Sequence, residues 1–151
     1  MSTYREERYT TLLKQVESLV SGEVNLIANM ANLSAAIYAE FQFHWVGFYL
    51  VEDNELVLGP FQGPVACTRI KKGRGVCGTA WAKNEVQIVA NVNEFPGHIA
   101  CSPYSCSEIV LPVENDGQVI AVLDIDSEEY NSFTELDATY LNKLIALLVK
   151  A

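Results

Sequence analysis

The order of hydrophobic patterns along the chain is the feature that most constrains its fold. Apolar residues recur at helical spacing in three segments, residues 4–19, 24–41 and 134–150. Segments rich in β-branched and aromatic residues predict strands at residues 44–51, 55–58, 66–70, 86–90, 108–113 and 119–125. Because the strands follow one another in hairpin-like succession, we predict an α+β fold, an antiparallel β-sheet with the N- and C-terminal helices packed on one face. Ser132 and Glu135 have the spacing of a capping box at the start of the last helix.

Length and charge limit what the chain can do. Its 151 residues suffice for one domain with a hydrophobic core. The formal net charge of −9 argues against nucleic acid and anionic membrane surfaces as partners, since both require clustered lysine and arginine. The N-terminus lacks the layout of a signal peptide, and no apolar run approaches the roughly 20 residues that span a bilayer. We therefore expect a cytoplasmic protein whose four cysteines are mainly reduced thiols.

A glycine-rich turn at residues 73–78 delivers a cysteine to the start of a predicted short helix. Cys77 would lie near unpaired backbone N–H groups in the first helical turn, which favour the thiolate. The same residues match the dinucleotide-binding pattern G-x-G-x-x-G. That pattern requires a parallel strand–helix–strand unit with an acidic residue about 20 positions further on. Here Glu94 falls in a predicted loop and the strands are expected to be antiparallel, so dinucleotide binding is disfavoured.

The other cysteines leave several chemistries open. His98, Cys101 and Cys106 lie close together in the sequence, and Cys67 or Cys77 could complete a zinc site. His98 could also serve as the base for a nucleophilic Cys101. No Cys-x-x-Cys pair is present, and a base three residues away in a loop is weak evidence for a hydrolase. Redox chemistry among Cys67, Cys77 and Cys101 fits better, against the alternative that the thiols are small buried hydrophobic groups.

Three acidic residues point to a proton donor. Asp124 and Asp126 lie two positions apart on one strand and therefore on one face. A three-residue loop at 115–117 would pair them with the neighbouring strand so that Glu108 lies opposite Asp124, whereas a two-residue turn would place Glu108 opposite Ile125. We choose the three-residue loop. Carboxyl groups this close together raise the pKa of at least one of them, which keeps a proton available near neutral pH. The alternative interpretation is that the three acids have no chemical role and lie at the solvated end of a strand.

Two aromatic residues on the first strand suggest a binding pocket. Trp45 and Tyr49 share a face with Gly47 between them. The missing side chain would leave a slot for a small apolar group or for a cation over a ring. An aromatic stripe on a strand is more often part of the core, and Gly47 is the reason to prefer a pocket.

These segments together resemble one family. The matching stretches follow one another in order: His44–Tyr49, Leu58–Gly63, Ala66–Cys67, Gly73–Ala80, Gly97–Cys101, Ser107–Pro112 and Val122–Ser127. Through them the chain resembles the free methionine-(R)-sulfoxide reductases, in which a single GAF domain acts as an enzyme. The resemblance implies one GAF domain over residues 1–151, with the short helix and loops over the pocket.

The resemblance also implies a role for each candidate residue. Cys101 corresponds to the thiol usually assigned as the attacking nucleophile and Cys67 to its resolving partner, while Cys77 corresponds to a third cysteine that attacks or resolves. Cys106 stands where another residue is expected, and it either competes as a resolving thiol or is inert. The substrate-binding candidates are the aromatic walls Trp45 and Tyr49, and the acids for the amino group and the sulfoxide end, Glu108, Asp124 and Asp126.

The activity that the resemblance implies is reduction of free L-methionine (R)-S-oxide through a cysteine sulfenic acid and an intramolecular disulfide. The family uses no bound cofactor or metal, and thioredoxin, linked to NADPH, restores its thiols. A homodimer is expected by analogy with GAF domains that pair through their terminal helices. The alternative function is a GAF sensor or small-ligand-binding module without turnover.

Overall fold

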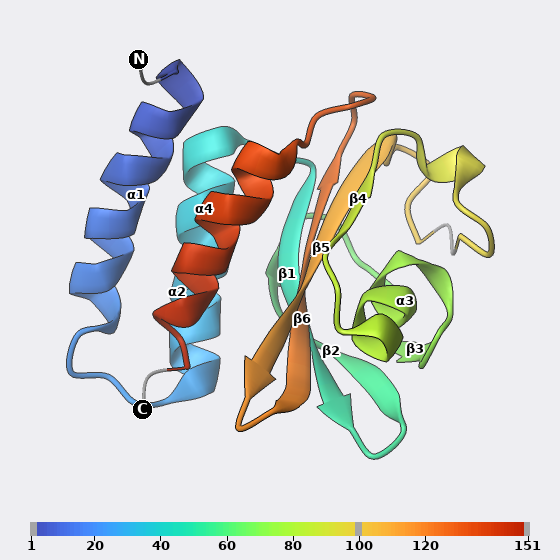
Figure 1. Ribbon diagram of the computed structural model, residues 1–151, viewed down its shortest axis with the longest axis horizontal. Helices are drawn as coiled ribbons and strands as arrows, with labels where there is room; N and C mark the ends of the chain where they lie inside the picture. Colours follow the sequence, from blue (N-terminus) through green and yellow to red (C-terminus); the bar gives the residue numbers. More distant parts are fainter. Residues whose placement is uncertain (1–2, 99–100, 150–151) are drawn as a thin grey trace.

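The computed structural model describes residues 3–98 and 101–149, which form a six-stranded antiparallel sheet with helices on both faces (Figure 1). The sheet order is β3-β2-β1-β6-β5-β4. The strands are β1 (Trp45–Glu52), β2 (Glu55–Gln62), β3 (Arg69–Lys71), β4 (Gln87–Val89), β5 (Ser107–Asn115) and β6 (Gln118–Ser127). The helices are α1 (Tyr4–Val20), α2 (Leu26–Phe41), α3 (Gly75–Lys83), the short 3-10 helix η1 (Val92–Glu94) and α4 (Glu135–Ala146). The predicted α+β class is confirmed, and the predicted end of the last helix, Lys150, lies outside the described residues.

The two faces of the sheet carry separate hydrophobic cores. On one face, α2 and α4 pack against the strands and α1 covers them from outside (Figure 1). On the other face, α3 and the long loops cover a second core that includes both tryptophans and Cys77. Within the described residues, no helix combines the length and the apolar character that crossing a membrane requires. The two-sided arrangement explains why β5 and β6 are apolar on both faces.

The strands on either side of α3 decide whether the glycine pattern at residues 73–78 can bind a dinucleotide. β3 and β4 lie at opposite edges of the sheet, and every strand pairs antiparallel to its neighbour. The parallel unit that dinucleotide binding requires is therefore not formed by these residues.

The cap of α4 differs from the prediction by two residues. Thr134, not Ser132, is the N-cap, and its capping-box partner is Asp137, not Glu135. Asp137 is buried, and its Oδ1 accepts a hydrogen bond of 2.6 Å from the Tyr9 hydroxyl on α1. Thr134 and Asp137 have the same local spacing as Ser132 and Glu135, so spacing alone offered both pairs. The bond from Tyr9 is a long-range contact that only the Thr134–Asp137 cap makes.

Strand β2 continues past its predicted end at Leu58. The strand includes Pro60 and runs to Gln62. A bulge places Gly59 and Pro60 together opposite Phe48 of β1. Proline is tolerated there because a bulge residue need not donate to the ladder.

The β5–β6 hairpin has a different register from the one predicted. The turn is the two-residue Asp116-Gly117, with left-handed backbone angles at both residues. A bulge beyond the turn, with Ile120 as its extra residue, shifts the pairing by one more position. Glu108 therefore lies opposite Asp126, and the prediction of Asp124 was wrong. Because the error is two residues in total, the acids keep the face that was predicted for them.

Candidate active site

Helix α3 carries Cys77 onto the sheet. Gly73 and Gly75 adopt left-handed backbone angles of φ 80° and φ 62°, which lets the chain turn sharply into the helix. Cys77 lies in the first turn, as predicted, but its side chain points down onto the strands and is only 4% exposed. Burial, followed by the neighbouring Asp124 and Glu108 carboxyls, raises the pKa of the Cys77 thiol well above its ordinary value. The expected thiolate is therefore wrong, because desolvation and nearby acids outweigh the helix terminus.

The buried position of the Cys77 thiol predicts slow alkylation, and the rate can be measured directly. We expect iodoacetamide to alkylate Cys77 of the reduced native protein at least about tenfold more slowly than Cys106, because alkylation requires an accessible thiolate. Peptide mass mapping of a time course gives both rates in one sample. Cys77 labelling as fast as Cys106 would contradict the buried, protonated thiol and restore the activated thiolate.

Three acids share one face of the sheet beneath α3: Glu108 and Asp124 are buried, and Asp126 is partly buried. Asp124 and Asp126 of β6 lie opposite Gly47 and Trp45 of β1, and Glu108 lies opposite Asp126 from the other side. Burial raises the pKa of Glu108 and of Asp126 well above the ordinary value, with the Asp124 carboxyl adding to both, and burial also raises the pKa of Asp124. The direction of these shifts favours the protonated forms, in line with the prediction that at least one of the acids has a raised pKa.

One oxygen in this cluster has no partner in the structure. Asp124 Oδ1 is buried and accepts no hydrogen bond among the described residues. A buried oxygen of this kind is costly unless a ligand or water satisfies it. The opening above it is the pocket, so this oxygen is a candidate contact for a polar group of a bound ligand.

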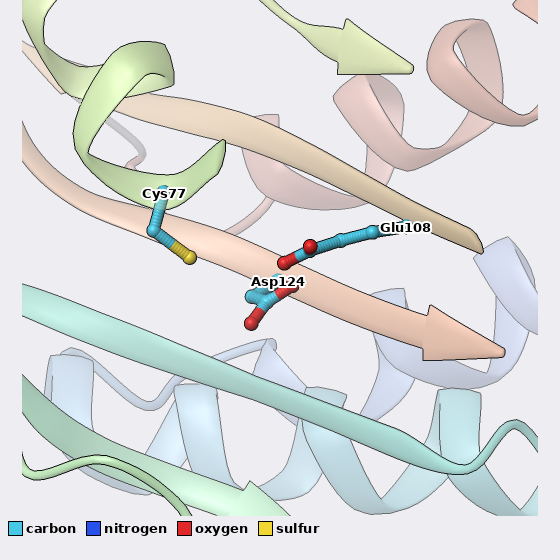
Figure 2. Close-up of side chains that lie close together, drawn as sticks. All are labelled: Cys77, Glu108 and Asp124. Carbon is cyan, nitrogen blue, oxygen red and sulfur yellow. The ribbon is translucent and has the colours of Figure 1, made fainter. Parts of the chain in front are cut away.

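Cys77, Glu108 and Asp124 converge on one point. Figure 2 shows the thiol of α3 and the two carboxyl groups of the sheet turned toward one another, and their ligand-type atoms lie within 4.8 Å of one another. The donor set is compatible with a cation, but the raised pKa values mean that the ion would have to displace protons. This set differs from the zinc ligands considered from the sequence.

The aromatic wall is real, but Gly47 does not make the slot that we predicted. Trp45 and Tyr49 stack with ring centroids 5.9 Å apart, and Phe61 stacks on the other side of Trp45 at 5.2 Å. The space over Gly47 is filled by Phe61 and by the Trp45 ring itself. Phe61 was missed because it lies beyond the predicted end of the strand at Leu58.

This packing predicts a stability effect at Gly47. A Cβ there would lie 2.3 Å from the Phe61 Cβ and 2.6 Å from a ring atom of Trp45. We expect Gly47→Ala to lower the free energy of unfolding by about 1–3 kcal/mol, the usual cost of overpacking. Urea unfolding followed by tryptophan fluorescence measures it. An unchanged midpoint would show that the space over Gly47 is open, as the sequence had suggested.

Two hydrogen bonds fix the aromatic residues in the wall. Trp45 Nε1–H donates to the Pro64 carbonyl at 3.0 Å, and the Tyr49 hydroxyl donates to the Cys67 carbonyl at 2.8 Å. Tyr49 therefore connects the floor of the pocket to the segment that carries Cys67.

Cys67 and Cys101 form a disulfide at the mouth of the pocket, with Cα atoms 5.5 Å apart. Both residues are partly exposed. This pairing, which the resemblance implied, leaves Cys77 and Cys106 free and uses two of the thiols that a zinc site would need. His98 Nε2 lies 4.0 Å from Glu108 Oε1, and burial lowers the pKa of the imidazole. Cys106 Sγ lies 3.8 Å from the Tyr104 carbonyl, so Cys106 is not the partner of Cys101 in this structure.

The pocket brings the predicted residues together. Its lining includes Trp45, Tyr49, Cys77, Cys101, Glu108, Asp124 and Asp126, and Cys67 joins it through the disulfide. Arg74 and Ser105 also line it and were not predicted. No sequence signal distinguishes Arg74 from the neighbouring basic residues Lys71 and Lys72.

Comparison with known proteins agrees with this geometry. The GAF domain family model matches residues 27–151. The GAF domain-containing protein A of Dictyostelium discoideum is 59% identical over 145 residues, 95% of this chain and 92% of that protein. The free methionine-R-sulfoxide reductase of Escherichia coli (strain K12) is 50% identical over 147 residues, 97% of this chain and 89% of that protein. The solved structure of free methionine-R-sulfoxide reductase from Neisseria meningitidis in complex with its substrate is 50% identical, with a TM-score of 0.94 over 98% of this chain and 90% of that one.

Proposed function

The chain belongs to the GAF domain family and, within it, to the free methionine-(R)-sulfoxide reductases, and from this premise we propose that it reduces free L-methionine (R)-S-oxide to L-methionine. The observation that carries the proposal is the Cys67–Cys101 disulfide at the mouth of a pocket whose floor holds the buried acids Glu108 and Asp124 and the partly buried Asp126. A ligand sensor would need neither a redox-active pair of cysteines nor a proton donor beside it.

The reaction uses one thiol, one proton donor and one resolving thiol. The Cys101 thiolate attacks the sulfoxide sulfur while an acid of the cluster protonates the oxygen, which would otherwise leave poorly. The hydroxyl group then passes from the methionine sulfur to Cys101 Sγ as the bond between the two sulfurs breaks. Methionine departs with its sulfur reduced, and Cys101 is left as a sulfenic acid. The Cys67 thiol then displaces this oxygen as water and forms the disulfide, which protects Cys101 from further oxidation. An external dithiol finally transfers two electrons and two protons to restore both thiols.

The acid cluster also accounts for a free amino acid as the substrate. We propose that Trp45 and Tyr49 hold the side chain of the ligand, and that Glu108, Asp124 and Asp126 contact its amino group and its sulfoxide end. A free ammonium group offers charge and three donors to buried carboxyl oxygens, including Asp124 Oδ1. A peptide nitrogen is uncharged and blocked, so a protein-bound methionine sulfoxide would gain much less binding free energy from these acids.

We propose thioredoxin, recharged by NADPH, as the external dithiol. The partly exposed Cys67–Cys101 pair is accessible to an attacking thiolate, which thiol–disulfide exchange requires. This proposal also favours the cytoplasm, where such reductants keep thiols reduced, and no bound cofactor is needed. The homodimer and the assignment of residues 1–151 to a single domain stay predictions.

A single-turnover experiment tests the function without any reductant. The reduced protein is mixed with one equivalent of free methionine (R)-sulfoxide, and we expect about one methionine per chain together with the Cys67–Cys101 disulfide in peptide maps. Binding of the sulfoxide without methionine release, with all thiols intact, would favour the sensor.

A further inference from the structure

A short chain of side-chain contacts joins the loop of Cys101 to the body of the domain. Ser102 is the neighbour of Cys101, and its Oγ atom lies 3.0 Å from Nε2 of the His44 imidazole. The other ring nitrogen, Nδ1, lies 3.0 Å from Glu128 Oε1. His44 directly precedes β1 and Glu128 directly follows β6, so this Ser102–His44–Glu128 chain connects three separate segments.

One of these hydrogen bonds has a fixed direction. Because the Glu128 carboxylate can only accept, His44 Nδ1 carries a proton and donates it to the hydrogen bond. Nε2 is the partner of Ser102 Oγ: it accepts from the hydroxyl in the neutral tautomer and donates to it in the imidazolium. The Ser102 oxygen also accepts from the Tyr104 backbone N–H at 3.3 Å. The imidazole side chain is only 9% exposed, so it is held between its two partners.

The order serine, histidine, acid is also that of hydrolase triads, but two observations favour a positioning role. The acid is 63% exposed, whereas a catalytic acid that orients histidine is normally buried. The serine oxygen also accepts a backbone hydrogen bond inside its own turn. These contacts fix Ser102 in place instead of presenting it as a nucleophile.

The described part of the loop, residues 101–105, is joined to the body by the Cys67–Cys101 disulfide and by the Ser102–His44 bond. In a reductase the disulfide opens in every cycle, and the contact to His44 is then the attachment next to the nucleophile. We propose, resting on the proposed reductase function, that His44 is a positioning residue. It holds Ser102, and with it Cys101, within reach of both the substrate and Cys67 while the disulfide is open. Holding the loop reduces the ordering cost of each bond-forming step.

The test compares two amide replacements of the imidazole. The amide of His44→Gln reaches the position of Nε2 and can accept from Ser102, whereas the amide of His44→Asn reaches only the position of Nδ1 and loses Ser102. The first measurement is the equilibrium between dithiol and disulfide in glutathione buffers, followed by mass mapping of Cys67 and Cys101. We expect His44→Asn and Ser102→Ala to lower the equilibrium constant for disulfide formation about tenfold, the effect of losing one hydrogen bond. His44→Gln should stay within about threefold of the wild type.

The second measurement separates positioning from binding. The His44→Asn protein should show a kcat about tenfold lower with KM for the sulfoxide nearly unchanged, because His44 is not among the residues that line the pocket. Wild-type equilibrium constants in both His44→Asn and Ser102→Ala would overturn the proposal. The glutathione equilibrium requires no sulfoxide, so it tests His44 even if the wild-type protein has no reductase activity.

Discussion

Cys101→Ser should lower kcat/KM for free methionine (R)-sulfoxide by about 10³-fold or more, with dithiothreitol as the reductant. Serine cannot take the oxygen of the sulfoxide as a sulfenic acid, so the chemistry loses its acceptor and not merely a binding contact. Cys106→Ser is the matched control on the same loop. Cys106 Sγ faces the Tyr104 carbonyl and not the disulfide, and we expect its activity to stay within about twofold of the wild type.

The same assay assigns the remaining thiols. Cys67→Ser should still release about one methionine per chain in a single turnover, because the attack precedes the step that needs Cys67. Full activity in Cys101→Ser, with loss of activity in Cys77→Ser, would show that Cys77 attacks first and would overturn the proposed roles of the thiols.

Glu108→Gln should lower kcat by about 10²–10⁴-fold, the usual cost of losing general acid catalysis. The same substitution should raise the stability of the protein. Burial and the neighbouring acids raise the pKa of Glu108, so the unfolded chain releases this proton at a lower pH than the folded protein does. Between the two pKa values the unfolded state binds fewer protons, and the free energy of unfolding falls as the pH rises. Glutamine has no proton to lose, so it avoids this cost.

The predicted gain in stability of Glu108→Gln over the wild type depends on pH. The midpoint of thermal unfolding of Glu108→Gln should match the wild type near pH 4 and exceed it by a growing margin toward pH 8. Glu114→Gln, an exposed position on the same strand, is the control and should show no such trend. An equally active variant would exclude Glu108 as the general acid. A variant that is less stable at pH 8 than at pH 4, relative to the wild type, would exclude the raised pKa of Glu108.

The sequence predicted the fold class because hydrophobic periodicity and turn chemistry are local. The hairpin register could not be obtained in this way, because the bulge at Ile120 depends on packing across the sheet. The state of Cys77 was mispredicted for a similar reason. The helix terminus is visible in the sequence, but burial against Asp124 depends on where α3 docks. Gly47 was predicted to leave a slot between the aromatic residues, but the space beside it is filled by Phe61, a contact that no local pattern indicates.

The roles of the cysteines came from a different source. Spacing alone left redox, zinc and hydrolase chemistry open for the cysteines, and the family resemblance selected among them. The Ser102–His44–Glu128 chain was not predicted, because its members lie 58 and 84 positions from His44 and carry no pattern of their own.

Stereochemistry and substrate size test the central claim most directly. The purified protein is incubated with dithiothreitol and racemic free methionine sulfoxide, and chiral chromatography measures what remains; an N-acetylated, amidated sulfoxide runs in parallel. We predict that only the R form of the free amino acid disappears and that the blocked compound is left untouched. Consumption of both forms, equal consumption of the blocked compound, or no turnover by the fully reduced protein would contradict the proposed reductase.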